Sequence, residues 1–281
     1  MKIFKTTGDV SAYIEGIKQA KSTVGFVPTM GALHAGHISL IKQAREDGGI
    51  IVCSIFVNPT QFNDKKDLEK YPVTTEADIE LLLEADCDVL FLPSVQEMYP
   101  EGTEAGKMYD FGYLETILEG AQRPGHFRGV GQIVSRLLEA IRPNKLYIGQ
   151  KDYQQCMVIT KLAKLMGLNE LKVIICPTNR EADGLAMSSR NRRLTEPQRA
   201  LAGVIYQCLV SIQGKKDVGN FEVIQKECIE LLSAKGFAPE YVSLADARDL
   251  TLLDNYKVGT PMVALIAARL GDVRLIDNIL V

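Results

Sequence analysis

The stretch that decides the fold reads Val24-Gly25-Phe26-Val27-Pro28-Thr29-Met30-Gly31-Ala32-Leu33-His34-Ala35-Gly36-His37. Its apolar start, 24–27, predicts a buried strand, and Pro28 is expected to end that strand because proline cannot donate to a sheet ladder. Gly31 then permits a tight turn. A helical pattern follows at about 37–47, with its apolar residues on one face. The two histidines are therefore expected where a strand is followed by the N-terminus of a helix.

This helix N-terminus favours a phosphate ligand. Its first backbone N–H groups have no partner within the helix, and its end of the helix dipole is positive. His34 and His37 add donors that can meet charge as it develops on a phosphoryl oxygen. Two other interpretations stay open here. The pair could bind a metal, although no third ligand is near and the glutamate of a His-Glu-x-x-His helix is absent, or it could simply cap the helix.

Composition excludes several classes of protein. The 281 residues are 46% hydrophobic and 24% charged, which is ordinary for a globular chain of one large or two smaller domains. A net charge of -3 gives no basic field for nucleic acid. The N-terminal residues lack the apolar core of a signal peptide, and no apolar run is long enough to span a membrane. Six cysteines without a Cys-x-x-Cys pair favour a reducing cytosol, with neither disulfides nor a zinc site. We expect a cytoplasmic protein without nucleic-acid or membrane partners.

Apolar runs alternate with helical patterns through the first 180 residues, which predicts an α/β fold with a Rossmann-like parallel sheet. Asp9 is the candidate N-cap of a leading helix, and 63–72 is expected to be a polar loop. The expected strands after the first lie at 50–57, 89–92, 146–148 and 171–176, and the expected helices at 9–21, 75–85, 127–141 and 153–166.

After Pro177 the pattern changes to that of a smaller α+β unit. Thr195 is a candidate N-cap, and Gly271 lies in an expected turn between the last two strands. The expected helices lie at 197–213 and 221–235, and the expected strands at 241–245, 262–268 and 272–277. The predicted domains are therefore 1–180, a Rossmann-like binding domain, and 181–281, a smaller domain that acts as a lid.

Ligands of open α/β sheets bind outside the carboxyl ends of the strands. Those ends carry the histidines, one lysine and several side-chain amides, which we expect to face one crevice. The sets are Thr29–Gly31 with His34 and His37, Asn58 with Gln61, Gly149–Asp152 with Gln155, and Pro177–Asn179. Three residues nearby are ambiguous. Asp78 could assist Mg²⁺, but a position on a helix surface is the favoured interpretation. Asp152 could bind a ligand or cap a helix, and Arg123 could bind a phosphate or form a surface ion pair.

Paired motifs carry a family resemblance. His34-Ala35-Gly36-His37 with Met187-Ser188-Ser189-Arg190 resembles the signature of the nucleotidyltransferase superfamily that includes class I tRNA synthetases. The full set closely resembles the pantothenate synthetase (pantoate–β-alanine ligase) family from about residue 20 to 195, and the C-terminal third adds little. The motifs are Pro28 to His37, Asn58-Pro59-Thr60-Gln61-Phe62, Gly125-His126-Phe127-Arg128-Gly129-Val130, Gly149-Gln150-Lys151-Asp152-Tyr153-Gln154-Gln155 and Asp183 to Asn191.

This resemblance implies an enzyme that joins (R)-pantoate to β-alanine. Pantoate and ATP would give a pantoyl adenylate and pyrophosphate, and β-alanine would then displace AMP. It implies a cytoplasmic homodimer, with Mg²⁺ accompanying ATP and no metal site made by the protein. The implied catalytic residues are His37, His34 and Lys151; Gln61 and Gln155 would bind pantoate, and Gln61 also β-alanine. The implied ATP-binding residues are Met30, Gly31, Ala32, Leu33, His34, Ala35, Gly36, His37, Gly149, Gln150, Lys151, Asp152, Asn179, Met187, Ser188, Ser189 and Arg190.

Elementary chemistry is compatible with this reaction. A carboxylic acid titrates near pH 4, so the pantoate carboxylate is an ionised nucleophile that needs no general base. Met187 stands where the tRNA synthetase motif has a lysine, so charge on the phosphates would have to be met by Lys151, Arg190 and the histidines. Other possibilities are a nucleotidyltransferase with a different acceptor, a short tRNA synthetase-like protein, and a non-catalytic nucleotide-binding module. The second is opposed by the acidic pI of about 5.8.

Overall fold

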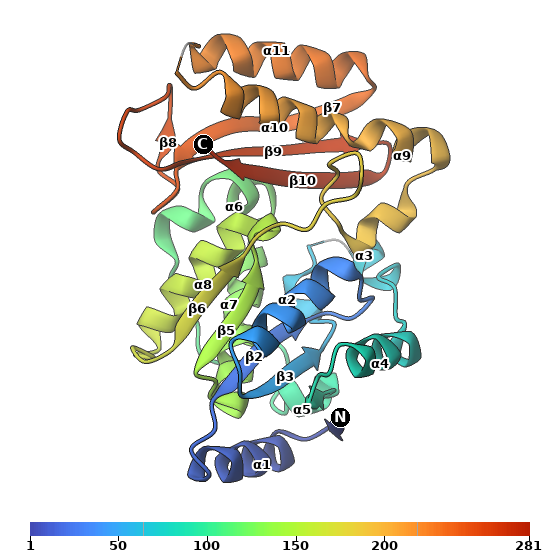
Figure 1. Cartoon of the computed structure of the whole chain (residues 1–281), viewed down its shortest axis with the longest axis vertical. Coiled ribbons are helices and arrows are strands. Elements are labelled where there is room, and N and C mark those ends of the chain that lie inside the picture. The colour runs from blue at the N-terminus through green and yellow to red at the C-terminus, as the bar shows by residue number, and fades with distance from the viewer. Residues whose placement is uncertain (64, 218) are drawn as a thin grey trace. The chain divides into compact units, whose positions relative to one another are not determined.

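The computed structural model describes residues 1–63, 65–217 and 219–281. These residues form two compact units, which are described separately (Figure 1). The first unit comprises Met1–Gly149 and Gln154–Cys176, and the second comprises Gln150–Tyr153 and Pro177–Val281. The chain therefore leaves the first unit for four residues after Gly149, returns to it, and leaves it again after Cys176.

The first unit is built on a parallel sheet. Among its described residues the sheet has six strands in the order β1-β4-β3-β2-β5-β6, all paired in parallel, which confirms the Rossmann-like prediction. The strands are β1 (Lys2–Phe4), β2 (Val24–Thr29), β3 (Ile50–Ile55), β4 (Val89–Phe91), β5 (Lys145–Gly149) and β6 (Lys172–Cys176). From β2 the chain moves outward through β3 to β4, and then crosses to β5 and β6. The strand order thus reverses between β2 and β5, the place where such sheets bind ligands.

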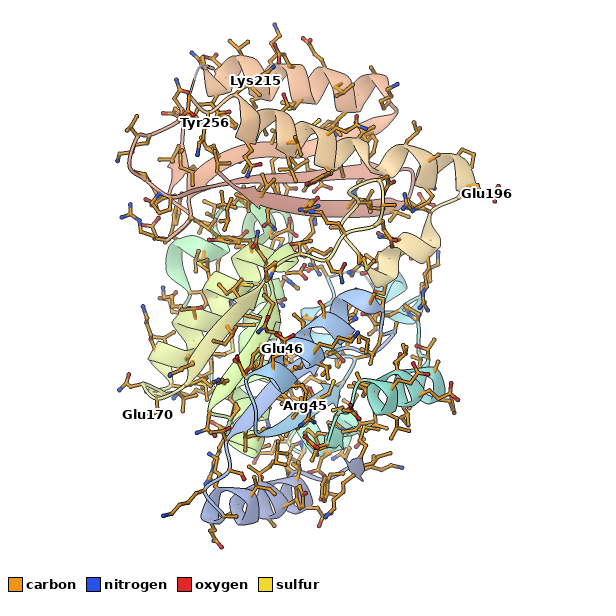
Figure 2. The ribbon with its side chains drawn as sticks, in the orientation of Figure 1. Arg45, Glu46, Glu170, Glu196, Lys215 and Tyr256 are labelled. Carbon is orange, nitrogen blue, oxygen red and sulfur yellow. The ribbon has the colours of Figure 1, made fainter. Side chains whose placement is uncertain are left out.

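Helices cover the sheet of the first unit. They are α1 (Thr7–Gln19), α2 (Ala35–Glu46), α3 (Lys65–Glu69), α4 (Thr75–Glu84), α5 (Val95–Met98), α6 (Leu118–Gln122), α7 (His126–Ile141) and α8 (Tyr153–Leu165), with 3₁₀ turns η1 (Pro59–Gln61) and η2 (Gly112–Glu115). Leu40 and Ile41 of α2 and Leu82 of α4 are buried in one apolar cluster with β2 and β3. Arg45, which is labelled in Figure 2, lies in the last turn of α2. It forms an ion pair at 2.6 Å with Asp88, the residue just before β4.

Pro28 does not end its strand, contrary to the prediction. Strand β2 continues through Thr29 and stays paired with β3 along its length. The carbonyl of Thr29 accepts from Phe56 N–H on the β3 side, so Pro28 faces the opposite neighbour, β5. Pairing with β5 has already ended at Phe26. The missing N–H of proline therefore removes no ladder hydrogen bond.

Other local predictions also need correction. Helix α1 is capped by Thr6, whose hydroxyl accepts from Asp9 N–H at 3.1 Å, and Asp9 itself lies in the first turn. Strand β3 ends at Ile55 rather than at 57. The expected loop at 63–72 contains α3; its residue 64 lies outside the described residues. Strand β1 was not predicted, because three residues with two exposed positions give no periodic signal.

The second unit contains an antiparallel sheet. Within the described residues its order is β10-β9-β7-β8, with β7 (Phe237–Asp246), β8 (Leu252–Leu253), β9 (Met262–Leu270) and β10 (Val273–Leu280). The predicted hairpin between β9 and β10 is confirmed, and Gly271 has the positive φ (59°) that its turn needs. The 3₁₀ turns of this unit are η3 (Gln150–Asp152) and η4 (Ser189–Arg193).

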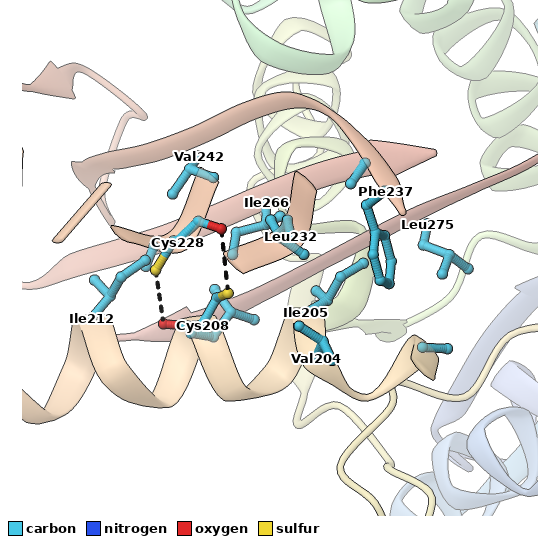
Figure 3. Close-up of a cluster of buried hydrophobic side chains, with 14 of the residues drawn as sticks. Val204, Ile205, Cys208, Ile212, Cys228, Leu232, Phe237, Val242, Ile266 and Leu275 are labelled. Carbon is cyan, nitrogen blue, oxygen red and sulfur yellow. Dashed lines mark hydrogen bonds between the residues drawn. The ribbon is translucent and has the colours of Figure 1, made fainter. Parts of the chain in front are cut away.

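Helices α9 (Glu196–Ala202), α10 (Val204–Gly214) and α11 (Phe221–Ala234) complete the second unit. Thr195 is the N-cap of α9, as predicted. The single helix expected at 197–213 is divided at Gly203, where a Cβ would lie 2.9 Å from the Asp183 carbonyl oxygen. Helices α10 and α11 cover one face of the sheet (Figure 1). Between them, Cys208 and Cys228 each donate a thiol to the other's carbonyl, at 3.8 and 3.7 Å (Figure 3).

All six cysteines are free and buried. Burial raises the pKa of Cys87 to about 11. No helix in the described parts of the chain is long and apolar enough to cross a membrane.

Candidate active site

Residues 30–37, here called the histidine turn, follow β2 directly and lead into the first turn of α2. Gly31 has φ +78°, and a Cβ there would lie 3.0 Å from both Asp78 and Ile55, so the turn requires glycine. His34 is the N-cap of α2, and its Nδ1 accepts from Gly36 N–H at 3.1 Å. A neutral His34 then carries its proton on Nε2, which makes that nitrogen a donor. The His34 and His37 rings lie 4.0 Å apart, centroid to centroid.

Asp78 holds this turn in place. Its side chain is 1% exposed, so it does not lie on the helix surface, which was the interpretation the sequence favoured. One carboxylate oxygen accepts from Ala32 N–H at 2.9 Å, and the other accepts from Leu33 N–H at 2.8 Å. Thr74 Oγ1 donates to the same carboxylate at 3.0 Å. The two residues before His34 are thus fixed to the first turn of α4.

Gln61 is brought to the same end of the sheet. It lies in η1, after β3, and its Nε2 donates to the Met30 sulfur at 2.8 Å. Its Oε1 accepts from Asn58 Nδ2 at 3.2 Å. Tyr99 Oη in turn donates to Asn58 Oδ1 at 2.7 Å, and burial raises the pKa of Tyr99. Met30 and Gln61 are therefore in contact, and the family resemblance implies ATP as the ligand of the first and pantoate as the ligand of the second.

The backbone of Gln61 is held as well. His126 Nδ1 lies 2.8 Å from the Gln61 carbonyl oxygen, and Arg123 donates to the same oxygen at 3.4 Å. Helix α7 approaches η1 closely at Gly129, where a Cβ would lie 2.4 Å from the Thr60 carbonyl oxygen. His126, Arg123 and Gly129 therefore support the position of Gln61. The sequence showed His126 and Gly129 only as part of a motif, and it left Arg123 open between a phosphate ligand and a surface ion pair. Contacts between distant segments leave no local pattern.

Gln154 and Gln155 are adjacent in α8 but differ in burial and in their hydrogen-bond partners. Gln154 is 2% exposed, and its carboxamide accepts from Glu119 N–H and donates to the carbonyls of Leu114 and Ile117. Gln154 therefore fixes the segment that ends in α6. Gln155 is half-buried in the first turn of the same helix. The structure does not link Gln155 to Gln61 by a hydrogen bond within the described residues.

In the second unit, Lys151 lies in η3. Its side chain is 19% exposed, and Nζ lies 3.4 Å from Asp152 Oδ1. Asn278 of β10 donates to the backbone carbonyls of Gln150 and Lys151, both at 2.9 Å. The segment that carries the predicted catalytic lysine is therefore attached to the antiparallel sheet.

The remaining predicted ATP residues lie on one folded loop of the second unit. Asn179 and Met187 are brought together, since Met187 N–H donates to the Asn179 carbonyl at 3.0 Å. Ser188 caps η4 by accepting from Arg190 N–H at 3.3 Å, and Ser189 is buried. Arg180 forms a two-fold ion pair with Asp277 at 2.6 and 3.0 Å. Burial raises the pKa of Asp277, and Arg180 opposes this shift.

The donors that each unit presents suit the binding of an anion. The described residues contain no group of three or more histidine, cysteine, aspartate or glutamate side chains placed to hold a metal ion. The first unit presents imidazoles at a helix N-terminus, and the second presents a lysine, two serines and an arginine, all of which can donate to phosphate oxygens.

The fold and the histidine turn define the class of this protein: a doubly wound α/β protein whose second strand leads into a candidate phosphate-binding helix N-terminus. The chain belongs to the pantoate-beta-alanine ligase family, whose model matches residues 2–280, and it is an enzyme. The family resemblance is thereby confirmed. The match also covers the C-terminal third, in which the sequence motifs alone gave little sign of it.

Named relatives cover nearly the whole chain. Pantothenate synthetases of Azobacteroides pseudotrichonymphae and Porphyromonas gingivalis are each 44% identical to it, and each alignment covers 99% of both chains. The crystal structure of pantothenate synthetase from Thermus thermophilus has a TM-score of 0.91 and 38% identity, again over 99% of both chains. A pantoate-beta-alanine ligase from Francisella tularensis, complexed with beta-gamma ATP and beta-alanine, has a TM-score of 0.82 and 39% identity, and covers 100% of this chain and 97% of that one.

Proposed function

We propose that this enzyme condenses (R)-pantoate with β-alanine to pantothenate, using ATP, through a pantoyl adenylate. Pyrophosphate leaves in the first step and AMP in the second. Family membership and the names of the relatives support the ligation itself. ATP as cosubstrate is supported by the Francisella tularensis ligase complexed with beta-gamma ATP and beta-alanine. The observation that carries the adenylate step is the pair of histidine rings at the N-terminus of α2, 4.0 Å apart.

In the first step the pantoate carboxylate attacks the α-phosphorus of ATP. This nucleophile is already ionised, so the residues need only align the reactants and stabilise charge on the phosphates. His34 and His37 donate to phosphate oxygens, and Lys151 adds a positive charge. Ser188, Ser189 and Arg190 hold other oxygens of the nucleotide, beside Asn179 and Met187. Gln61 and Gln155 bind pantoate, because a carboxamide offers both the donor and the acceptor that a hydroxy acid needs.

In the second step β-alanine displaces AMP from the adenylate. Its ammonium must first lose a proton, and its amine then attacks the acyl carbon, so that an amide bond forms as the bond to AMP breaks. Gln61 is assigned to β-alanine as well as to pantoate. The fixed backbone of Gln61, held by His126 and Arg123, suits a residue that contacts both substrates.

Mg²⁺ is proposed to arrive bound to the ATP phosphates and to neutralise part of their charge. This ion commonly keeps several waters and uses few protein ligands besides substrate phosphates. The Asp78 carboxylate already accepts three hydrogen bonds, from Ala32, Leu33 and Thr74, which leaves it little capacity to bind the ion. The residues that meet the Mg²⁺-bound nucleotide are then the neutral and cationic donors named above.

The assembly and location implied by the family resemblance are also proposals. We propose a homodimer in the cytoplasm, without nucleic-acid partners. Sedimentation equilibrium of the purified protein checks the first point: a mass of twice 31.0 kDa is expected, and a monomer at all concentrations contradicts it.

Isotope exchange tests the proposed reaction. With pantoate present and β-alanine absent, the enzyme should exchange labelled pyrophosphate into ATP, because the adenylate step is reversible on its own. A panel of other small acids serves as the control. Exchange that strictly requires β-alanine contradicts a separate adenylate step, and exchange with another acid but not with pantoate favours a nucleotidyltransferase with a different acceptor.

A variant tests the assignment of the acid subsite. Gln155→Ala should weaken pantoate binding about tenfold, the effect of losing one or two hydrogen bonds, and leave ATP binding nearly unchanged. Isothermal titration with each substrate separates the two affinities. Equal losses for both substrates would show that Gln155 does not act on the acid alone.

A further inference from the structure

We propose that Asn278 is a positioning residue for Lys151: its carboxamide holds the backbone of this lysine in the arrangement that binds ATP. The inference rests on the proposed function, because it takes Lys151 as a ligand of the ATP phosphates. Asn278 lies in β10 and is 127 residues from Lys151 along the chain.

The contact uses the whole carboxamide of Asn278. Its Nδ2 donates to the carbonyls of Gln150 and Lys151, both at 2.9 Å, and its Oδ1 accepts from Gln150 Nε2 at 3.2 Å. The side chain is 2% exposed. The two N–H groups of the buried Asn278 Nδ2 therefore donate to two consecutive carbonyls, which constrains both the position and the orientation of this short segment.

The segment that carries Lys151 is short. Turn η3 is three residues long, and hydrogen bonds in 3₁₀ geometry are poorer than those of an α-helix. Gln150–Tyr153 is grouped with the second unit, although the residues on either side of it, Gly149 and Gln154, belong to the first. The contacts of β10 with η3 account for this grouping. The two hydrogen bonds from Asn278 of β10 therefore help to fix the backbone of Lys151.

Asp277, the residue before Asn278 on β10, contacts the other segment of this unit to which ATP binding is assigned, the loop from Asn179 to Arg190. Asp277 pairs with Arg180, which also donates to the carbonyls of Gly184 at 2.9 Å and Asn278 at 3.0 Å. Arg180 lies one residue after Asn179, at the start of the loop that returns to Met187. Two adjacent residues of one strand therefore contact both segments of the second unit to which ATP binding is assigned.

The chemistry requires a carboxamide at position 278. An aspartate of the same shape would place a carboxylate oxygen against two carbonyl oxygens, and an alanine would leave both carbonyls without this partner. Either change should let the Lys151 backbone shift. Loss of ATP affinity alone would not separate this effect from general damage to the strand, so the test must ask whether Asn278 acts through Lys151.

A double-mutant cycle asks this question. ATP affinity is measured by isothermal titration for the wild type, Asn278→Asp, Lys151→Met and the double variant. Each single change should raise the dissociation constant for ATP about tenfold. The double variant should bind only about as weakly as Lys151→Met, because no ammonium is left to position. Asn278→Ala is carried through the same cycle, so that the result does not depend on the folding of the charged variant.

Gln213→Glu is the matched control. Gln213 Nε2 donates to the carbonyl of Leu280 at 2.7 Å, so this change also converts an amide donor to an acid beside β10 without touching η3. It should change ATP affinity less than about twofold. Thermal unfolding of every variant is followed by circular dichroism to ensure that folded proteins are compared.

The outcomes are distinct. Fully additive losses, or wild-type ATP affinity in Asn278→Asp and Asn278→Ala, overturn the positioning role. Unchanged affinity in Lys151→Met overturns both the assignment of Lys151 and the inference. The titrations need neither pantoate nor β-alanine, so failure of the wild type to make pantothenate would reject the proposed reaction separately.

Discussion

At the scale of single residues, His37 is the third residue of α2 and lies in its first turn, at the positive end of the helix dipole. We expect His37→Ala to slow adenylate formation by about 10²–10³, the usual effect of removing one donor that meets developing charge. Pantoate affinity should change little. Single-turnover formation of the adenylate and titration with pantoate measure the two quantities. A variant that forms the adenylate at nearly the wild-type rate would remove His37 from the chemistry.

Asp78 supports the same site indirectly, because its carboxylate holds the two residues before His34. Asp78→Asn should replace one acceptor by an N–H₂ group that faces a backbone N–H of the histidine turn, and so disturb the approach to His34. We expect a loss of about 1–3 kcal/mol in the free energy of unfolding, together with slower adenylate formation. Urea unfolding and single-turnover kinetics measure these effects.

Glu76→Gln is the control for Asp78→Asn, since Glu76 is exposed in the same first turn of α4. It should leave stability and rate within error. Hydrogen exchange at Ala32 and Leu33 provides a direct check, because their N–H groups should exchange faster in Asp78→Asn alone. Unchanged exchange would contradict the assigned hydrogen bonds.

At the scale of elements, the packing of α7 on η1 determines where Gln61 lies. Gly129→Ala would place a methyl group 2.4 Å from the Thr60 carbonyl oxygen, so one of the two elements must move. We expect about 1–3 kcal/mol of destabilisation, as for other overpacked sites, and weaker pantoate binding. Thermal unfolding and titration with pantoate test both.

Gly16→Ala is the matched control for Gly129→Ala. Gly16 lies inside α1, and no heavy atom would lie within 4 Å of an added Cβ. This change should raise the free energy of unfolding by about 0.4–1 kcal/mol, because alanine loses less backbone entropy on folding than glycine. Equal effects of the two substitutions would show that close packing does not distinguish these positions.

At the scale of the whole molecule, the expected lid role of residues 181–281 stays a prediction. The chain passes between the units at Gly149–Gln150, Tyr153–Gln154 and Cys176–Pro177, and short connections of this kind can serve as hinges. If closure protects the adenylate from water, the radius of gyration should fall when ATP and pantoate are both added. Small-angle X-ray scattering measures it, with pantoate alone as the control. Superimposable curves in all states would contradict the lid.

The sequence predicts the long elements well, because each carries its own periodic pattern. The parallel strands and the β9–β10 hairpin are examples. Strand β1 is too short to show a pattern, and its pairing with β4 depends on residues 89–91. The continuation of β2 through Pro28 could not be predicted either, since it depends on where the neighbouring strand β5 stops pairing.

Candidate site residues can likewise be predicted where a local pattern places them, and not where contacts between distant segments do. The place of the histidines, where a strand is followed by a helix N-terminus, could be inferred from neighbouring residues. The support given by Asp78 to Ala32, and by Asn278 to Lys151, joins residues 46 and 127 positions apart. Such pairings leave no spacing to detect, so one aspartate was interpreted as a surface residue and the asparagine was not singled out.

The separation between Lys151 and Asn278 has a consequence for how the enzyme is made. Ribosomes synthesise a chain from its N-terminus at about 5–20 residues per second. Asn278 is 127 residues after Lys151, so roughly 6–25 s pass between the synthesis of the two residues. All six strands of the parallel sheet exist once β6 (Lys172–Cys176) has been synthesised, early in this interval, and they can then pair. The nascent protein can therefore assemble its histidine turn early, but it gains a positioned lysine only when β10 has been translated and has joined its sheet.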